Sequence, residues 1–238
     1  MPCVLFSSQF VSRARSNVLA IALLSMSAIA SPASAQAQTT IGPVTATTPV
    51  VQGFQAVVND SRVQAMLEQI AINEPETLAE QVRLTQIPAP PFQEQDRAQY
   101  YLQQMRSRGL NDAYIDSEGN VLGLRKGSGD GPLFVIAAHL DTVFPLETDV
   151  TVQMREGRYY APGISDDGRG LTVLLTLIDA INSSAIPTVG DILFVGNVGE
   201  EGPGDLRGIK AVFRDHPDID GFVSIDGSGL TRITTGAT

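Results

Sequence analysis

The chain has 238 residues, 43% of them hydrophobic, a formal charge of −10 and a mean hydropathy of +0.06. This composition is typical of a soluble globular protein with a sizeable core. The strong negative charge argues against nucleic acid or an anionic membrane surface as a partner.

Residues 1–35 have the features of a secretory signal peptide. Arg13 and Arg15 precede an apolar run at 18–30 that is too short for a comfortable membrane span. Small residues then offer a cleavage site before Gln36. We therefore expect an exported protein, periplasmic or extracellular, with no stable membrane association after cleavage. An uncleaved N-terminal anchor is the alternative.

Residues 36–60 are rich in Thr, Ala, Gln and Pro, which predicts a flexible lead-in. Apolar residues at helical spacing then predict three helices before the first strand. These helices are expected around residues 63–70, 76–84 and 98–105.

Strand and turn signals dominate the second half of the chain. Hairpins are expected around the turns at 117–119 and 156–157. Continuous apolar runs predict three buried strands, at residues 132–138, 191–198 and 221–226. Further helices are expected from residue 171 and over 205–216. Buried strands that alternate with helices predict an α/β fold whose sheet is largely parallel in its middle.

Acidic residues and a histidine follow the ends of the three buried strands. They are His139, Asp141, Glu200, Glu201 and Asp226. The carboxyl ends of parallel strands meet at one edge of a sheet, so these side chains are expected to lie close together. Asp166 and Asp167 add two more acids in a glycine-rich loop before a helix. Each group alone has an ordinary alternative, such as a loop histidine, solvated acids, or helix capping by Asp167.

Taken together, these residues favour a metal site. Clustered carboxylates repel one another unless a cation neutralises them, and zinc accepts histidine nitrogen and carboxylate oxygen. Cysteine ligands are excluded because Cys3 is the only cysteine and lies in the signal segment. Asp141 is spaced to accept the second N–H of the His139 imidazole and fix its orientation. Of Glu200 and Glu201, one suits a metal ligand and the other a general base.

Four motifs carry a resemblance to a known family. "AAHLDTV", "APGISDDGRG", "GNVGEEG" and "FVSIDGSG" occur in the order found in the co-catalytic zinc exopeptidases of the peptidase T, carboxypeptidase G, aminoacylase and acetylornithine deacetylase superfamily. The resemblance implies a three-layer α/β sandwich with a mostly parallel central sheet. Residues 61–238 would be the N-terminal part of the catalytic domain, ending where a lid or dimerisation domain begins.

The resemblance also implies roles for individual residues. The metal ligands would be His139, Asp166, Glu201 and Asp226. Asp166 would bridge two zinc ions, for which cobalt or manganese could substitute. Asp141 would orient His139, and Glu200 would be the general base. The Asp166–Asp167 peptide bond would be cis.

The resemblance implies one more histidine ligand late in the domain. His216 precedes its strand and is interpreted as a surface or loop histidine, so this chain alone is expected to bind zinc weakly and turn over little. The expected activity is cleavage of a terminal peptide bond, with a possible homodimer formed through the lid. The alternatives are an N-acyl amino acid deacylase, a lid-less zinc aminopeptidase relative, and a non-catalytic protein that keeps the fold for binding.

Overall fold

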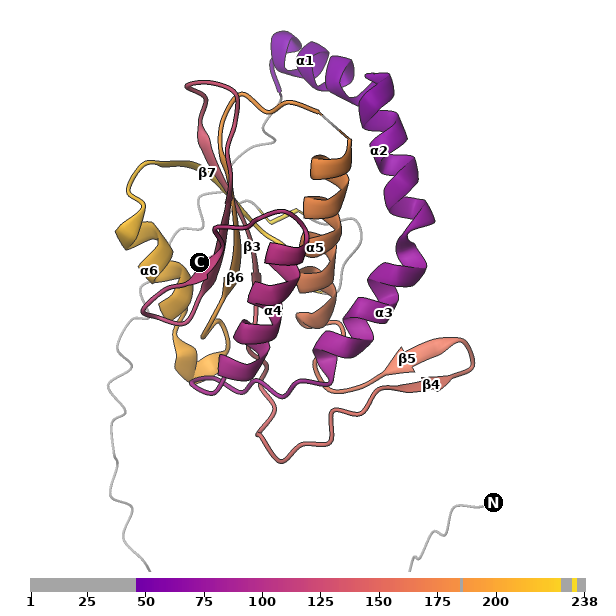
Figure 1. Ribbon diagram of the computed structural model, residues 1–238, viewed down its shortest axis with the longest axis vertical. Helices are drawn as coiled ribbons and strands as arrows, with labels where there is room; N and C mark the ends of the chain where they lie inside the picture. Colours follow the sequence, from indigo (N-terminus) through magenta and orange to yellow (C-terminus); the bar gives the residue numbers. More distant parts are fainter. Residues whose placement is uncertain (1–45, 185, 228–232, 235–238) are drawn as a thin grey trace, which may run out of the picture. The chain divides into compact units, whose positions relative to one another are not determined.

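A computed structural model describes residues 46–184, 186–227 and 233–234 (Figure 1). The predicted signal peptide and the first ten residues of the lead-in lie outside the described residues. The helices are α1 (Thr48–Val58), α2 (Ser61–Ile72), α3 (Glu74–Thr85), α4 (Gln95–Ser107), α5 (Gly168–Ser183), α6 (Arg207–Asp215) and a short 3-10 helix at Gly202–Gly204. The strands are β1 (Tyr114–Ile115), β2 (Val121–Arg125), β3 (Leu133–His139), β4 (Gln153–Arg155), β5 (Arg158–Tyr160), β6 (Ile192–Asn197) and β7 (Ile219–Ser224).

Five of these strands form a mixed sheet with the order β1-β2-β6-β3-β7. β3 pairs in parallel with both β6 and β7, as predicted for the middle of the sheet. β2 pairs antiparallel with β1 and with β6. The β1–β2 link is a tight hairpin, which can join only antiparallel strands, so the sheet is parallel on one side only.

Helices cover both faces of this sheet, which confirms the three-layer sandwich (Figure 1). On one face, α3, α4 and α5 contribute Leu84, Tyr101 and Leu174 to a core that includes Phe194 of β6. On the other face, Val212 of α6 packs with a second set of strand residues. Successive strand side chains alternate between the two cores, as the pleat of a strand requires.

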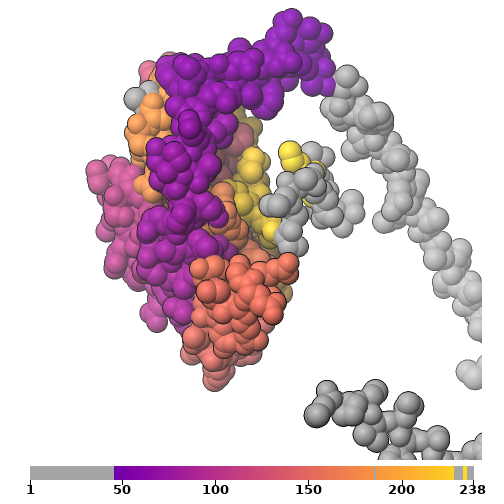
Figure 2. All heavy atoms as spheres, turned by 90° about the vertical axis from the view of Figure 1, so that its right-hand side faces the viewer, coloured from indigo at the N-terminus to yellow at the C-terminus, as the bar shows by residue number. Residues whose placement is uncertain are grey.

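The predicted flexible lead-in is wrong for residues 48–58, which form α1. Pro49 lies in the first turn, where its missing N–H is not needed, and apolar residues then recur at helical spacing. None of the residues of α1 is buried. α1 and α2 lie on the surface in Figure 2, as does the β4–β5 hairpin. Among the described residues, no helix combines the length and apolar content needed to cross a bilayer.

The prediction that the third strand is buried is also wrong, because β7 is mostly exposed. It is the last strand of the described sheet and pairs only with β3. Phe222 is 38% exposed and Val223 45% exposed, although the Phe213 ring of α6 packs edge-on against Phe222 with centroids 5.3 Å apart. An apolar run predicts a strand, but it does not tell a central strand from an edge strand.

Candidate metal centre

The parallel strands β3, β6 and β7 bring their carboxyl ends to one edge of the sheet. β3 ends at His139, while Glu200 and Asp226 follow the ends of β6 and β7. The loop before α5 adds Asp166 to the same place. The sequence-predicted residues therefore meet at the edge where α/β sheets usually bind their ligands.

His139, Asp166 and Glu201 form a group whose ligand atoms all lie within 4.8 Å of one another. Nε2 of His139 lies 3.0 Å from an oxygen of Asp166 and 3.9 Å from an oxygen of Asp226. One imidazole nitrogen and several carboxylate oxygens are a donor set that suits zinc and other divalent metals. The residues present thus fit a bound metal ion.

The loop that carries Asp166 is fixed by its neighbour. The Asp166–Asp167 peptide bond is cis, as the family resemblance implies. Asp167 is buried and caps α5 by accepting the N–H of Gly170 at 3.0 Å. Its other oxygen accepts the backbone N–H of His139, also at 3.0 Å. Asp167 therefore caps the helix and also ties the loop to the end of β3.

Asp141 holds two parts of the site together, but not in the predicted way. Nδ1 of His139 lies 3.0 Å from the backbone carbonyl oxygen of Asp141 and 3.7 Å from its carboxylate. The carboxylate instead accepts the backbone N–H groups of Glu200 at 3.0 Å and Glu201 at 2.8 Å. The predicted side-chain hydrogen bond to the imidazole is thus replaced by a main-chain one. The chain turns after β3, which aims the carboxylate at the next loop.

The electrostatics of the site favour a positive charge at its centre. Burial lowers the pKa of His139, but Asp141, Asp167 and Asp226 outweigh it and raise that pKa to about 10. Burial, reinforced by the surrounding carboxylates, raises the pKa values of Glu200 and Glu201. Burial also raises the pKa of Asp167, to about 8, against the opposing effect of His139. A divalent cation would relieve this crowding of acids.

Residues 135–236, which include all of these side chains, match the family described as Peptidase family M20/M25/M40. In this range the chain is similar to the zinc exopeptidase superfamily.

Solved structures and curated proteins show the same similarity. A tripeptidase from Staphylococcus aureus is 26% identical with a TM-score of 0.54, covering 66% of this chain and 44% of that one. The aminopeptidase PepT from Bacillus cereus shares the fold, with 23% identity, a TM-score of 0.56 and coverage of 66% and 44%. A protein of Pyrococcus furiosus named as a LysW-lysine/LysW-ornithine hydrolase is 29% identical over 65% of this chain and 42% of its own length. The chain thus spans about two fifths of the length of such relatives.

One buried residue that contacts the backbone next to His139 was missed at the level of sequence. Arg97 is fully buried in α4 and donates hydrogen bonds to the carbonyls of Ile87 at 2.9 Å and Leu140 at 2.8 Å. Burial lowers its pKa to about 10, against the opposing charges of Asp141 and Asp167. Arg97 lies on the apolar stripe of its helix, four residues before Tyr101, and this was the available signal.

His216 lies apart from the metal centre. It follows α6 as the C-cap residue, at the start of β7 rather than at its end. It does not belong to the group of His139, Asp166 and Glu201. This position agrees with its interpretation as a loop histidine.

Proposed function

We propose that the protein is an exported di-zinc hydrolase that removes a residue from the end of a peptide. The observation that carries this proposal is the convergence of His139, Asp166 and Glu201 at the carboxyl edge of the sheet. A non-catalytic protein with this fold would have no need to keep both the ligand group and a separate acid beside it.

The metal would be held by His139, Asp166, Glu201 and Asp226. Asp166 would belong to the ligand set, because its carboxylate lies close to both His139 and Glu201. When bound, zinc supplies Lewis acidity that acidifies water and polarises an amide carbonyl.

The chain's own residues would then handle the proton. Glu200 is half-buried, and its raised pKa suits a carboxylate that takes a proton from water and returns it to the leaving amine. Asp141 would keep Glu200 and Glu201 in place through their backbone N–H groups. Because the Asp141 carboxylate accepts both of these N–H groups, it positions the proposed base Glu200 and the proposed ligand Glu201 together.

The proposed substrate is a short peptide cleaved at one end, as the names of the tripeptidase and aminopeptidase neighbours suggest. The second candidate is hydrolysis of an amide that joins an amino acid to an acyl or protein group. The names of the curated relatives, which describe LysW-lysine/LysW-ornithine hydrolysis, favour that class. A panel of tripeptides and N-acyl amino acids, with detection of the released amino acid, would separate the two.

Glu200→Gln tests the role of the base. We expect the full-length gene product carrying this change to lose at least about a hundredfold in hydrolysis while zinc still binds, because general bases contribute about that much or more. Glu68→Gln, on the exposed surface of α2, is the matched control and should leave hydrolysis unchanged. Wild-type hydrolysis in the Glu200→Gln protein would refute the assignment, and loss of zinc binding would make Glu200 a ligand.

Export rests on the sequence of residues 1–35, with its two arginines and following apolar run. N-terminal sequencing of the protein recovered from cells tests it. A mature protein that begins near Gln36 would support export, and an intact N-terminus in the cytoplasm would contradict it.

A further inference from the structure

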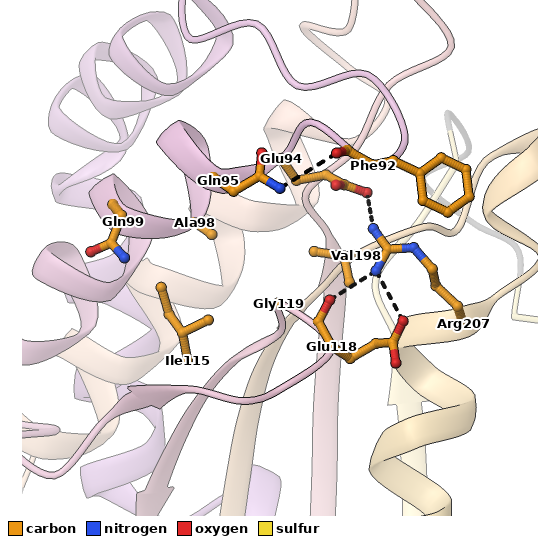
Figure 3. A pocket seen from close by; sticks show the side chains of 10 residues that line it. All are labelled: Phe92, Glu94, Gln95, Ala98, Gln99, Ile115, Glu118, Gly119, Val198 and Arg207. Carbon is orange, nitrogen blue, oxygen red and sulfur yellow. Dashed lines mark hydrogen bonds and ion pairs between the residues drawn. The ribbon is translucent and has the colours of Figure 1, made fainter.

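Arg207, the first residue of α6, joins three separate segments of the chain (Figure 3). One guanidinium nitrogen pairs with Glu94 at 2.6 Å, just before α4. The other contacts Glu118 in the β1–β2 turn, at 2.9 Å from the carbonyl oxygen and 3.2 Å from the carboxylate. The Phe92 ring lies over the guanidinium, with 4.9 Å from its carbon to the ring centroid.

The ion pair between Glu94 and Arg207 is largely buried, so its partners hold it in one geometry. The Glu94 side chain is 3% exposed and that of Arg207 19% exposed. A buried carboxylate needs a cationic partner, and two-point pairing restricts the guanidinium to one orientation. The Arg207 side chain is therefore a rigid element on this side of the sheet.

The Arg207 side chain packs directly against Gly199, which precedes Glu200. A Cβ atom placed on Gly199 would lie 2.7 Å from Cγ and from Nε of Arg207. Gly199 has a φ of 63°, in the left-handed region that glycine adopts without strain. The Arg207 side chain thus fills the space next to the backbone of the loop that carries Glu200 and Glu201.

The next two residues of the same loop are held by the carboxylate of Asp141, which accepts their backbone N–H groups. The residue before Gly199 is held as well, because the carbonyl of Val198 accepts the N–H of Gly208 at 3.1 Å. The segment is therefore fixed from α6 and from the end of β3. Removal of one support should loosen the loop without removing any metal ligand.

We propose that Arg207 is a positioning residue, which sets the loop carrying Glu200 and Glu201 through its contact with Gly199 and its pairing with Glu94 and Glu118. Its catalytic consequence rests on the proposed function, whereas its effect on the loop does not. Partners that orient metal ligands from outside typically contribute 10- to 100-fold to metal affinity or activity.

Arg207→Met tests the proposal by three readouts: amide hydrogen exchange of residues 198–202, zinc affinity and thermal stability. We expect exchange in that segment to become at least about tenfold faster and zinc affinity to fall about tenfold. Arg207→Lys should be intermediate, because lysine offers a point charge in place of a planar fork. Arg108→Met is the matched control, since Arg108 is 15% exposed and pairs with Asp179 at 2.9 Å, away from the loop.

Unchanged exchange and zinc affinity in Arg207→Met would overturn the proposal, as would the same changes in Arg108→Met. If Arg207→Met fails to fold, Glu94→Gln replaces it, with smaller changes expected in the same direction and no change as the refuting result. If the wild-type protein binds no zinc, the proposed function fails, but the exchange measurement still decides whether Arg207 sets the loop.

Discussion

The carboxylate of Asp141 accepts the backbone N–H of Glu200, a residue 59 positions further along the chain. Its second oxygen accepts the N–H of Glu201. The main-chain carbonyl of the same aspartate faces Nδ1 of His139 at 3.0 Å. One residue at the end of β3 therefore sets both the histidine and the loop after β6.

Asp141→Asn is expected to weaken zinc binding by about 10- to 100-fold. Asparagine has one amide oxygen, so it can accept from Glu200 or Glu201 but turns its NH₂ group toward the other N–H. The variant would still fold, because the shape of the side chain is unchanged. Competition with a chromophoric chelator would measure the affinity, and circular dichroism would report the fold.

Asp149→Asn provides the control for this change. Asp149 is exposed and also accepts a backbone N–H, that of Thr151 at 2.9 Å. Its zinc affinity should equal that of the wild type. If the two variants behave alike, the bridge made by Asp141 does not organise the metal centre.

Metal binding is expected to release protons and to strengthen as pH rises. Without metal, the raised pKa of His139, about 10, leaves the imidazole protonated at pH 7. Zinc needs a neutral imidazole, so binding must displace that proton. With one proton displaced, apparent affinity should rise about tenfold per pH unit below pH 10.

Calorimetry in two buffers of different ionisation enthalpy would measure the protons released. We expect about one proton to be released at pH 7 when the ion that His139 holds is bound. An enthalpy of binding that does not depend on the buffer would show that His139 is already neutral, or that it does not bind the ion.

The sequence predicted the positions of the site residues better than their contacts. β3, β6 and β7 were each visible as an apolar run, and their parallel pairing follows from the intervening helices. The contact between Asp141 and His139 was not predictable, because the backbone turn after β3 decides which oxygen of Asp141 faces the ring. The spacing of two residues determines whether their side chains lie on the same face of a strand, but it does not determine the course of the loop that follows the strand.

The burial of Arg97 depends on contacts with distant segments, which the hydrophobic pattern of the sequence does not show. A charged residue on an apolar stripe normally extends to solvent, whereas Arg97 is buried on carbonyl groups of distant segments. Those carbonyls become neighbours only after the chain has folded. The exposure of β7 has the same origin, because its position at the edge depends on the order of the strands.

Arg97→Met is therefore expected to destabilise the fold by about 3 kcal/mol or more. The change leaves buried carbonyls without donors and removes the positive charge near Asp141 and Asp167. Urea denaturation monitored by circular dichroism would measure the loss. Arg62→Met is the control, because the Arg62 side chain is 58% exposed and its solvent-exposed pair with Asp60 should contribute little to stability. Equal losses in the two variants would contradict the structural role of Arg97.

Gly196→Ala is expected to destabilise the protein by about 1 to 3 kcal/mol through overpacking between β6 and α4. A Cβ at this position would lie 2.8 Å from Cδ1 and 2.9 Å from Cε1 of the Tyr101 ring. The ring cannot swing away easily, because its hydroxyl donates to the carbonyl of Leu171 at 2.9 Å. Gly53→Ala is the opposite case, since nothing lies within 4 Å of the added Cβ and alanine favours the helical conformation of α1. Thermal unfolding should show a lower midpoint for Gly196→Ala and no lowering of the midpoint for Gly53→Ala. An unchanged midpoint for Gly196→Ala would mean that α4 can move away from the sheet at little cost.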